Sequence, residues 1–174
     1  MFVAWRLYGS LPQSKRVADE TLTPGQRFAA RDRELDRATN GPMWLKDSRV
    51  AQAVVDTLYL GQHTWKLYDL LAWVLMSNHV HILIKPHTHI AAITRAKKKH
   101  SARMANQILQ QSGSPFWQDE SYDHWVRDSA ELRRITRYIE WNPVRAGLVS
   151  MPESWPWSSA GQVGNLPHVH LTAP

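Results

Sequence analysis

Cysteine is absent from the 174 residues of this chain. Its absence excludes disulfides, thiolate metal sites and cysteine nucleophiles together, and it fits a reducing compartment. No uninterrupted apolar run approaches the roughly 18 to 20 residues that a membrane-spanning helix needs. The apolar start "MFVAWRLYGSLP" is broken by Arg6 and lacks the pattern of a secretory signal. We therefore expect a globular protein that stays out of the membrane and resides in the cytoplasm.

Acidic residues are too few to balance the basic ones. Twenty-one Lys and Arg stand against fifteen Asp and Glu, which gives a net charge of +6. A positive field favours polyanionic partners, and nucleic acid is the natural candidate, although many proteins carry such a charge for solubility alone. The length fits a single domain. We expect this domain to occupy residues 1–160 and a Pro/Gly-rich tail to occupy residues 161–174.

Apolar periodicity predicts a mixture of strands and helices. Ser77 and Asn78 separate two apolar runs and suit the turn of a tight hairpin. Asp128 and Glu131 form a D-x-x-E capping pattern at the start of a helix that Pro143 ends. The expected strands are 2–7, the run "KLYDLLAWVLM" and the run "HVHILI"; the expected helices cover about 48–62, 90–111 and 129–142.

Two regions have weaker patterns. Residues 12–42 are polar and charged, so we expect an exposed insertion that holds a short helix. Residues 115–128, "PFWQDESYDHWVRD", are aromatic and charged, and a loop or a short strand is expected there.

The segment "MSNHVHILIKP" carries His79 and His81 two residues apart within an apolar run. Side chains alternate along a strand, so both imidazoles project from the same face and supply half of a metal site. Without cysteine, the remaining ligands must be oxygen donors or water, which leaves room for a phosphate oxygen. Taken alone, an H-x-H pair is more often a pair of half-buried strand histidines that have hydrogen-bond partners.

Two further H-x-H pairs are weaker candidates. His87 and His89 follow Pro86, and His168 and His170 lie in the Pro-rich tail. Neither pair is held by a rigid strand. Only the first pair is expected to form a site.

Tyr138 and Asn142 are spaced i, i+4 on the last expected helix, so they share one helical face. A tyrosine hydroxyl can attack a phosphodiester and keep the energy of the broken bond in a phosphotyrosine. A divalent cation would assist, because an unperturbed phenol with a pKa near 10 is a poor nucleophile. Tyr138 as an ordinary helical residue and Asn142 as the residue before a helix-ending proline stay open.

Four segments taken together resemble the REP-associated tyrosine transposases: "LMSNHVHILI", "FWQDESYDHWVRD", "RYIEWNPVRAGLV" and "ESWPWSSA". These are cellular relatives of the single-strand insertion-sequence transposases of the HUH nuclease superfamily. The resemblance covers residues 1–160 and implies an α+β, ferredoxin-like domain with a central antiparallel sheet and helices packed on it. It also implies that His79 and His81 are metal ligands, that Tyr138 is the nucleophile, and that Asn142 is a third metal ligand.

The resemblance implies a metal-dependent single-stranded DNA endonuclease and strand transferase. It would act beside a hairpin like a repetitive extragenic palindrome, through a 5′-phosphotyrosine, with Mg²⁺ or Mn²⁺, in association with the nucleoid. A monomer is favoured over a homodimer. The expected DNA contacts are Arg95, Lys97, Lys98, Lys99, Arg103, Arg134, His124 and Trp125.

Each of these contacts has an ordinary alternative. The lysines and arginines of residues 95–103 could form a solvated helix face, and Arg134 could pair with Asp128 or Glu131. Two other functions also stay open. One is a domesticated module that binds structured single strands without cutting them. The other is a hydrolase of small phosphoesters, which would need more carboxylates near the histidines than the sequence places there.

Overall fold

A computed structural model describes residues 1–11, 21–38, 40–111 and 113–161. His168 and His170, and the expected tail beyond residue 161, lie outside the described residues. The regular elements are β1 (Phe2–Leu7), α1 (Pro24–Arg37), α2 (Ser48–His63), β2 (Tyr68–Leu75), β3 (His79–Pro86), α3 (Ile90–Ile108), β4 (Trp117–His124), α4 (Ser129–Glu140) and α5 (Asn142–Arg145). Within the described residues, no helix has the length and apolar character that a membrane span requires.

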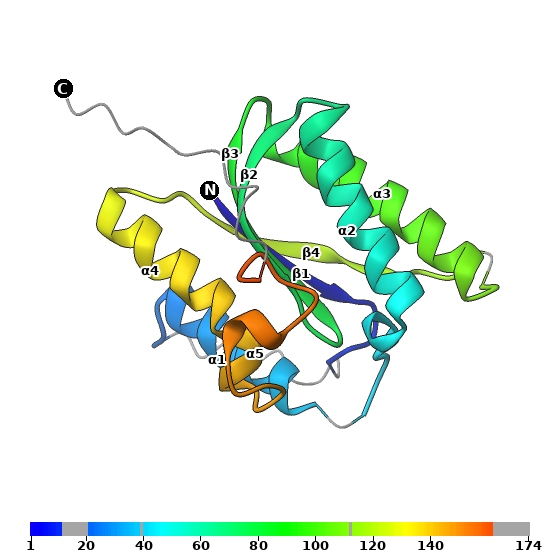
Figure 1. The fold of residues 1–174 in the computed structure, drawn as a ribbon, viewed down its shortest axis with the longest axis horizontal. Helices are drawn as coiled ribbons and strands as arrows, with labels where there is room; N and C mark the ends of the chain where they lie inside the picture. Colours follow the sequence, from blue (N-terminus) through cyan, green and yellow to red (C-terminus); the bar gives the residue numbers. More distant parts are fainter. Residues whose placement is uncertain (12–20, 39, 112, 162–174) are drawn as a thin grey trace.

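The strands form one sheet in the order β2-β3-β1-β4, and every neighbouring pair is antiparallel. The β2–β3 hairpin turns at Ser77 and Asn78, where the Met76 N–H donates to the His79 carbonyl at 2.9 Å. With α2 before the hairpin and α3 after it, the chain follows the β-α-β-β-α-β order of ferredoxin-like domains (Figure 1). The prediction of an α+β fold with a central antiparallel sheet is confirmed.

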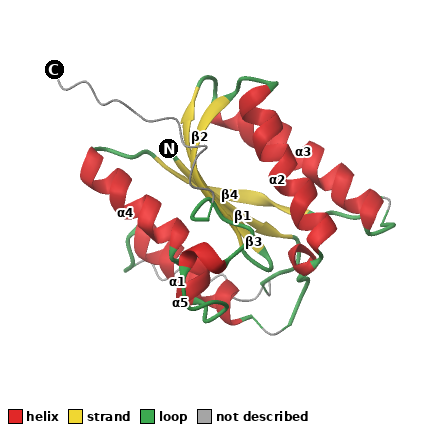
Figure 2. Cartoon of the chain, in the orientation of Figure 1, coloured by secondary structure: helices red, strands yellow, loops and turns green. Residues whose placement is uncertain are grey.

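The two faces of the sheet bury different sets of side chains. Val3, Val80 and Ile82 belong to a core that also contains residues of α2 and α3. Phe2, Ala4 and Leu83 belong to a second core with Ile139 of α4. Figure 2 shows the corresponding layers, with α2 and α3 on one side of the sheet and α1 and α4 on the other. Because side chains alternate along β3, His79 and His81 face the side of α1 and α4.

The region expected as an exposed insertion contains a full helix. α1 has 14 residues and begins with a capping box, in which Thr23 and Gln26 each accept a backbone hydrogen bond from the other. Asp32 and Leu35 are buried on its inner face. Residues 117–124 form the edge strand β4, which pairs with β1. The helix ends at 108 and 140 come slightly before the expected ends.

Gly61 of α2 lies against the ring of Tyr68, whose hydroxyl donates to the Leu58 carbonyl at 2.8 Å. A Cβ atom at residue 61 would meet the Tyr68 hydroxyl oxygen at 2.2 Å and its Cζ at 2.7 Å. We expect Gly61→Ala to lower the free energy of unfolding by about 1–3 kcal/mol, because overpacking outweighs the better helix propensity of alanine. Urea unfolding measures the change. Gly25→Ala is the matched control, since a Cβ there meets nothing within 4 Å; equal effects of both substitutions would contradict the packing argument.

Candidate metal and nucleophile site

β3 presents two buried imidazoles on one face of the sheet. The side chains of His79 and His81 belong to residues that are 1% and 0% exposed, and their ring centroids lie 4.8 Å apart. His81 also stacks on Phe2 of β1, at 5.6 Å between ring centroids. The strand therefore fixes the direction of both rings, as the i, i+2 spacing predicts.

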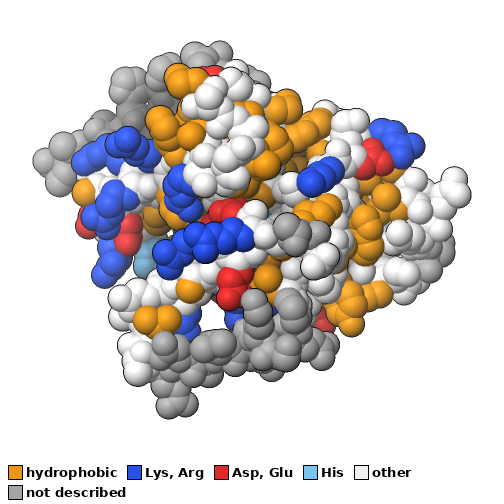
Figure 3. Space-filling view, turned by 90° about the horizontal axis from the view of Figure 1, so that it is seen from below, with side chains coloured by type: hydrophobic (Ala, Val, Ile, Leu, Met, Phe, Trp, Pro, Cys, Tyr) orange, Lys and Arg blue, Asp and Glu red, His pale blue; other side chains and the backbone are white. Residues whose placement is uncertain are grey.

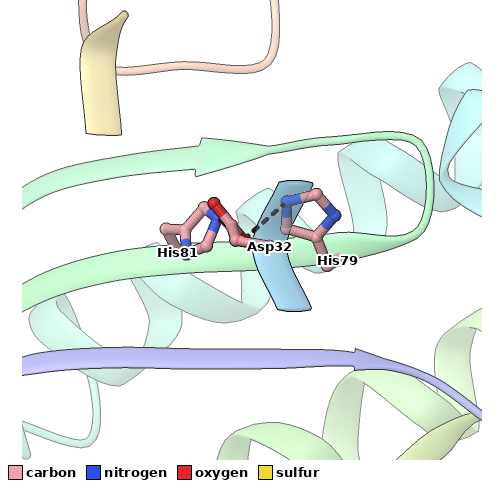
Figure 4. Close-up of side chains that lie close together, drawn as sticks. All are labelled: Asp32, His79 and His81. Atoms are coloured by element: carbon pink, nitrogen blue, oxygen red, sulfur yellow. Dashed lines mark ion pairs between the residues drawn. The ribbon is translucent and has the colours of Figure 1, made fainter. Parts of the chain in front are cut away.

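Asp32 of α1 completes a group of three potential metal ligands. Its Oδ1 lies 3.0 Å from Nε2 of His81 and 3.4 Å from Nε2 of His79. Figure 4 shows the carboxylate entering from α1 between the two rings. One ligand atom from each of the three residues lies within 4.8 Å of the other two, and all three residues are buried. This Asp-His-His group could hold a metal ion.

A hydrogen-bond chain fixes the tautomer of His79. Asn78 donates through Nδ2 to the Leu35 carbonyl at 3.0 Å, so its Oδ1 is the atom that faces Nδ1 of His79, at 2.7 Å. Nδ1 must therefore carry the proton, which leaves a lone pair on Nε2. Burial lowers the pKa of His79 to about 3, although the Asp32 carboxylate opposes this shift. A neutral ring with its lone pair aimed at Asp32 is the form that binds metal.

Several buried nitrogen and oxygen atoms near Asp32 lack hydrogen-bond partners among the described residues, as expected for a site that binds a divalent cation. Nε2 of His79, both ring nitrogens of His81 and Oδ1 of Asn142 are buried and make no hydrogen bond with any described residue. Buried polar atoms are almost always satisfied, and Nε2 of His79 and Nε2 of His81 both face Oδ1 of Asp32, so a cation held by these three atoms would give them a partner. Two imidazoles with carboxylate and amide oxygens suit a cation that prefers oxygen or nitrogen ligands.

Tyr138 and Asn142 meet the other oxygen of the same carboxylate. The Tyr138 hydroxyl donates to Oδ2 of Asp32, and Nδ2 of Asn142 donates to it at 3.3 Å. Burial and the Asp32 charge raise the pKa of Tyr138 above its usual value. Burial alone would raise the pKa of Asp32, but the adjacent His81 and His79 and the bond from Tyr138 hold it below its usual range. Asp32 is thus an anion shared between the histidines and the phenol.

Arg145 brings a cation to the phenol. Its Cζ lies 4.2 Å from the centroid of the Tyr138 ring, and its Nη2 lies 4.0 Å from Oδ2 of Asp32. The side chain is 40% exposed, so it can also meet a ligand. Asp36 lies one turn after Asp32, with Oδ1 at 3.8 Å from Nε2 of His79. Burial and the neighbouring Asp32 charge raise the pKa of Asp36 to about 6.

The three expected site residues on β3 and α4 are therefore brought together, whereas two others were missed. Asn142 is buried next to Asp32, to which its Nδ2 donates, and its role as a third metal ligand stays a prediction; Asp32 is a potential ligand in addition. Asp32 and Arg145 were not singled out from the sequence. Phe28, Asp32 and Leu35 share one face of α1 at i, i+4 and i+7 spacing, which is the pattern that could have revealed a buried acid.

The second H-x-H pair lies at the surface. Nε2 of His87 pairs with Asp69 at 3.1 Å, and both side chains are 40% exposed. His89 is the N-cap residue of α3. Neither joins a three-ligand group among the described residues.

The basic residues of α3 that were expected to contact DNA lie on the opposite side of the sheet from the histidines. For Lys97 this prediction is wrong. Lys97 is 1% exposed, with its ammonium 4.4 Å from the Trp5 ring centroid. It projects inward because its helical face carries the buried Ile93 and Ser101. Lys97 therefore belongs to the core and cannot contact DNA from this position. Lys98 is half-buried and donates to the carbonyls of residues 118, 119 and 120 of β4.

The other expected DNA contacts lie at the surface. Arg95, Lys99 and Arg103 are exposed on α3. Trp125 is 63% exposed, although it is a large aromatic residue. His124 lies beside it, with Nε2 at 3.0 Å from Oε1 of Glu131. Arg134 is exposed, and its Nη2 lies 3.9 Å from Oε1 of Glu131, so the alternative ion pair is present in part.

A second group of basic residues surrounds the site itself. Exposed arginines occur on α1 and α4, the two helices that cover the histidine face. Figure 3 shows Lys and Arg side chains gathered on the left of the lower face, which is the side of α1 and α4 in Figure 1. The residues are Arg27, Arg31, Arg33 and Arg37 on α1 and Arg133, Arg134 and Arg137 on α4. The two helices that cover the histidine face therefore carry a positive outer surface.

Residues 47–142 match the protein family described as "Transposase IS200 like". Two relatives share about a quarter of the aligned residues. A protein provisionally named REP-associated tyrosine transposase in Haemophilus influenzae is 24% identical over 103 residues, which span 53% of this chain and 58% of that protein. The REP-associated tyrosine transposase of Escherichia coli K12 is 26% identical over 98 residues, which span 53% of this chain and 54% of that protein.

A solved structure shares the fold. A REP-associated tyrosine transposase bound to a REP hairpin superposes with a TM-score of 0.58 at 16% sequence identity, covering 92% of this chain and 76% of the other. Alignment to the two relatives from H. influenzae and E. coli extends over only a little more than half of their length.

The Asn78 side chain is expected to support metal binding without touching the metal. Asn78→Ala removes the acceptor that fixes the His79 tautomer, so the affinity for Mn²⁺ should fall by about 10- to 100-fold. Isothermal titration calorimetry of the purified protein measures this change. Gln52→Ala is the control, because Gln52 bonds only Asp56 on the surface of α2. Unchanged Mn²⁺ affinity in Asn78→Ala would contradict the proposed role of the hydrogen-bond chain.

Proposed function

Because this chain belongs to the IS200-like transposase family, we propose that it is a metal-dependent single-stranded DNA endonuclease and strand transferase that acts at hairpin-forming repeats. The matched segment, residues 47–142, covers more than half of the chain and includes His79, His81 and Tyr138. One observation carries the proposal: a single carboxylate bridges the paired histidines and the tyrosine hydroxyl. Asp32 thus connects the proposed metal ligands, His79 and His81, to the proposed nucleophile, Tyr138.

Asp32, His79 and His81 would hold a divalent metal, Mg²⁺ or Mn²⁺, and the unpaired Oδ1 of Asn142 is a further oxygen donor at its side. When bound, such an ion polarises a phosphodiester and stabilises the charge that builds up on it. The remaining contributions come from the side chains of the protein.

Tyr138 is the proposed nucleophile. Its hydroxyl oxygen attacks the scissile phosphorus and forms a P–O bond, the phenolic proton passes to a solvent water, and the bond from phosphorus to the 3′-oxygen breaks while that oxygen takes up a proton from solvent. The 3′-oxygen leaves with a proton as a free 3′-hydroxyl, and the other strand end stays on the enzyme as a 5′-phosphotyrosine. Asp32 orients the phenol through its hydrogen bond, and the adjacent Arg145 guanidinium favours the anionic oxygen. The reverse reaction with another 3′-hydroxyl gives strand transfer.

Exposed cations and aromatic residues would hold the DNA. Arg95, Lys99, Arg103 and Arg134 can neutralise phosphates, while Trp125 and His124 can contact unpaired bases. Lys97 is excluded from this set by its burial, and Lys98 has only limited freedom to join it. The relative solved with a REP hairpin supports a hairpin as the structured part of the substrate. We propose a monomer that acts on chromosomal DNA in the cytoplasm.

Replacing the nucleophile tests the proposal. A labelled hairpin oligonucleotide with single-stranded flanks, incubated with the protein and Mn²⁺, should give a covalent adduct visible as a shifted band on a denaturing gel. Tyr138→Phe should abolish the adduct, and His79→Ala should reduce it by about 100-fold or more, because the metal site is lost. Tyr8→Phe is the matched control, since Tyr8 is exposed on the loop after β1.

Two outcomes would contradict this function. An adduct that persists in Tyr138→Phe would make another residue the nucleophile. Tight hairpin binding that is unaffected by chelator, with no cleavage of any hairpin tested, would instead favour the alternative function, a binding module for structured single strands that does not cut.

A further inference from the structure

A cavity of about 300 Å³ lies directly beside the ligand group. Asp32, His79 and His81 line it, and α1, β1 and the edge strand β4 form its walls. Its volume is at the small end of the roughly 300–1,000 Å³ range of ligand sites in proteins. The cavity can therefore hold one small planar group, whereas a DNA duplex is far too large for it.

The wall opposite the histidines is apolar and aromatic. Phe28 of α1 and Tyr122 of β4 stack on each other with ring centroids 4.4 Å apart, and both line the cavity. Phe28 also contacts the edge of the His81 ring, at 5.9 Å between centroids. Such a wall suits a flat π system, and every nucleobase has a π face.

The rim of the cavity carries positive charge. Arg27 and Arg31 line it and are exposed, one helical turn apart on α1, and Arg6 of β1 adds a third cation against one acid, Glu120 of β4. Arg27 donates to the Leu22 carbonyl at 2.5 Å, which holds its side chain along the start of the helix. Guanidinium groups at this spacing can contact successive phosphates of a single strand. The cavity thus combines an aromatic wall, a basic rim and a floor that is the ligand group itself.

We propose that this cavity binds one unpaired nucleotide of the single strand next to the scissile phosphate. Its base packs against Phe28 and Tyr122, and its backbone runs past Arg27 and Arg31. The inference rests on the proposed function, because the strand must place a phosphate at the ligand group. Since α1 precedes residue 47, its residues Phe28, Arg27 and Arg31 lie outside the part of the chain that matches the family, whereas Tyr122 lies inside it.

Abasic scanning of the substrate tests this inference without altering the protein. A fluorescent hairpin oligonucleotide carries a single abasic nucleotide at each flanking position in turn, and anisotropy in the presence of chelator measures affinity without cleavage. One position should lose about 5- to 150-fold in affinity, which is the value of stacking one base on an aromatic residue. Its neighbours should lose clearly less.

A matched pair of variants then assigns that position to the cavity. Phe28→Leu keeps an apolar side chain but removes the aromatic wall, so the loss at the sensitive position should shrink several-fold. Phe116→Leu is the control, because Phe116 stacks on Trp44 in the core on the α2 side of the sheet. Its abasic profile should equal that of the unaltered protein.

The outcomes separate this inference from the proposed function. A protein that cuts the hairpin through Tyr138, yet shows a flat abasic profile or the same profile in Phe28→Leu, would overturn the cavity assignment alone. A protein that binds no single strand at all would overturn both. A sensitive position whose loss shrinks only in Phe28→Leu supports the nucleotide site.

Discussion

The buried carboxylate of Asp32 is the interaction on which the site depends. An isolated charge is expensive to bury, so it persists only where partners surround it. Here the partners come from three elements: histidines from β3, a phenol from α4 and an amide from the start of α5. The same carboxylate therefore links α1 to the sheet and holds the Tyr138 hydroxyl next to the two histidines. Each element keeps its position because the others satisfy Asp32.

Side chains alternate along the strands, so one face of the sheet packs against helices and the other face carries the candidate site. Odd-numbered and even-numbered residues of β3 enter different cores, so α2 and α3 stabilise the sheet from one side while the other side carries the site. The hairpin turn is tied to α1, because Asn78 donates to the Leu35 carbonyl of α1. The same Asn78 side chain holds the His79 ring through its Oδ1. The exposed arginines of α1 and α4 give the helices that cover this side a positive surface, which favours an anionic partner.

Local patterns in the sequence were sufficient for the sheet, the main helices and the paired histidines, since apolar periodicity, the Ser77-Asn78 break and the Asp128 cap act over a few residues. Asp32 escaped prediction because it is 106 residues from Tyr138 in the chain and lies in a polar stretch. Lys97 was misplaced for the related reason that charge suggests exposure, whereas its helical face is buried. For the polar strand β4 the sequence left a loop and a short strand both open, because an edge strand needs few apolar residues.

The central claim is that Asp32, His79 and His81 form a metal site in contact with the nucleophile. A crystal structure of the protein soaked in Mn²⁺, with anomalous diffraction data, tests it most directly. The account predicts one anomalous peak within coordination distance of Nε2 of both histidines and an Asp32 oxygen. A peak bound elsewhere, or none at the histidines at saturating Mn²⁺, would contradict it.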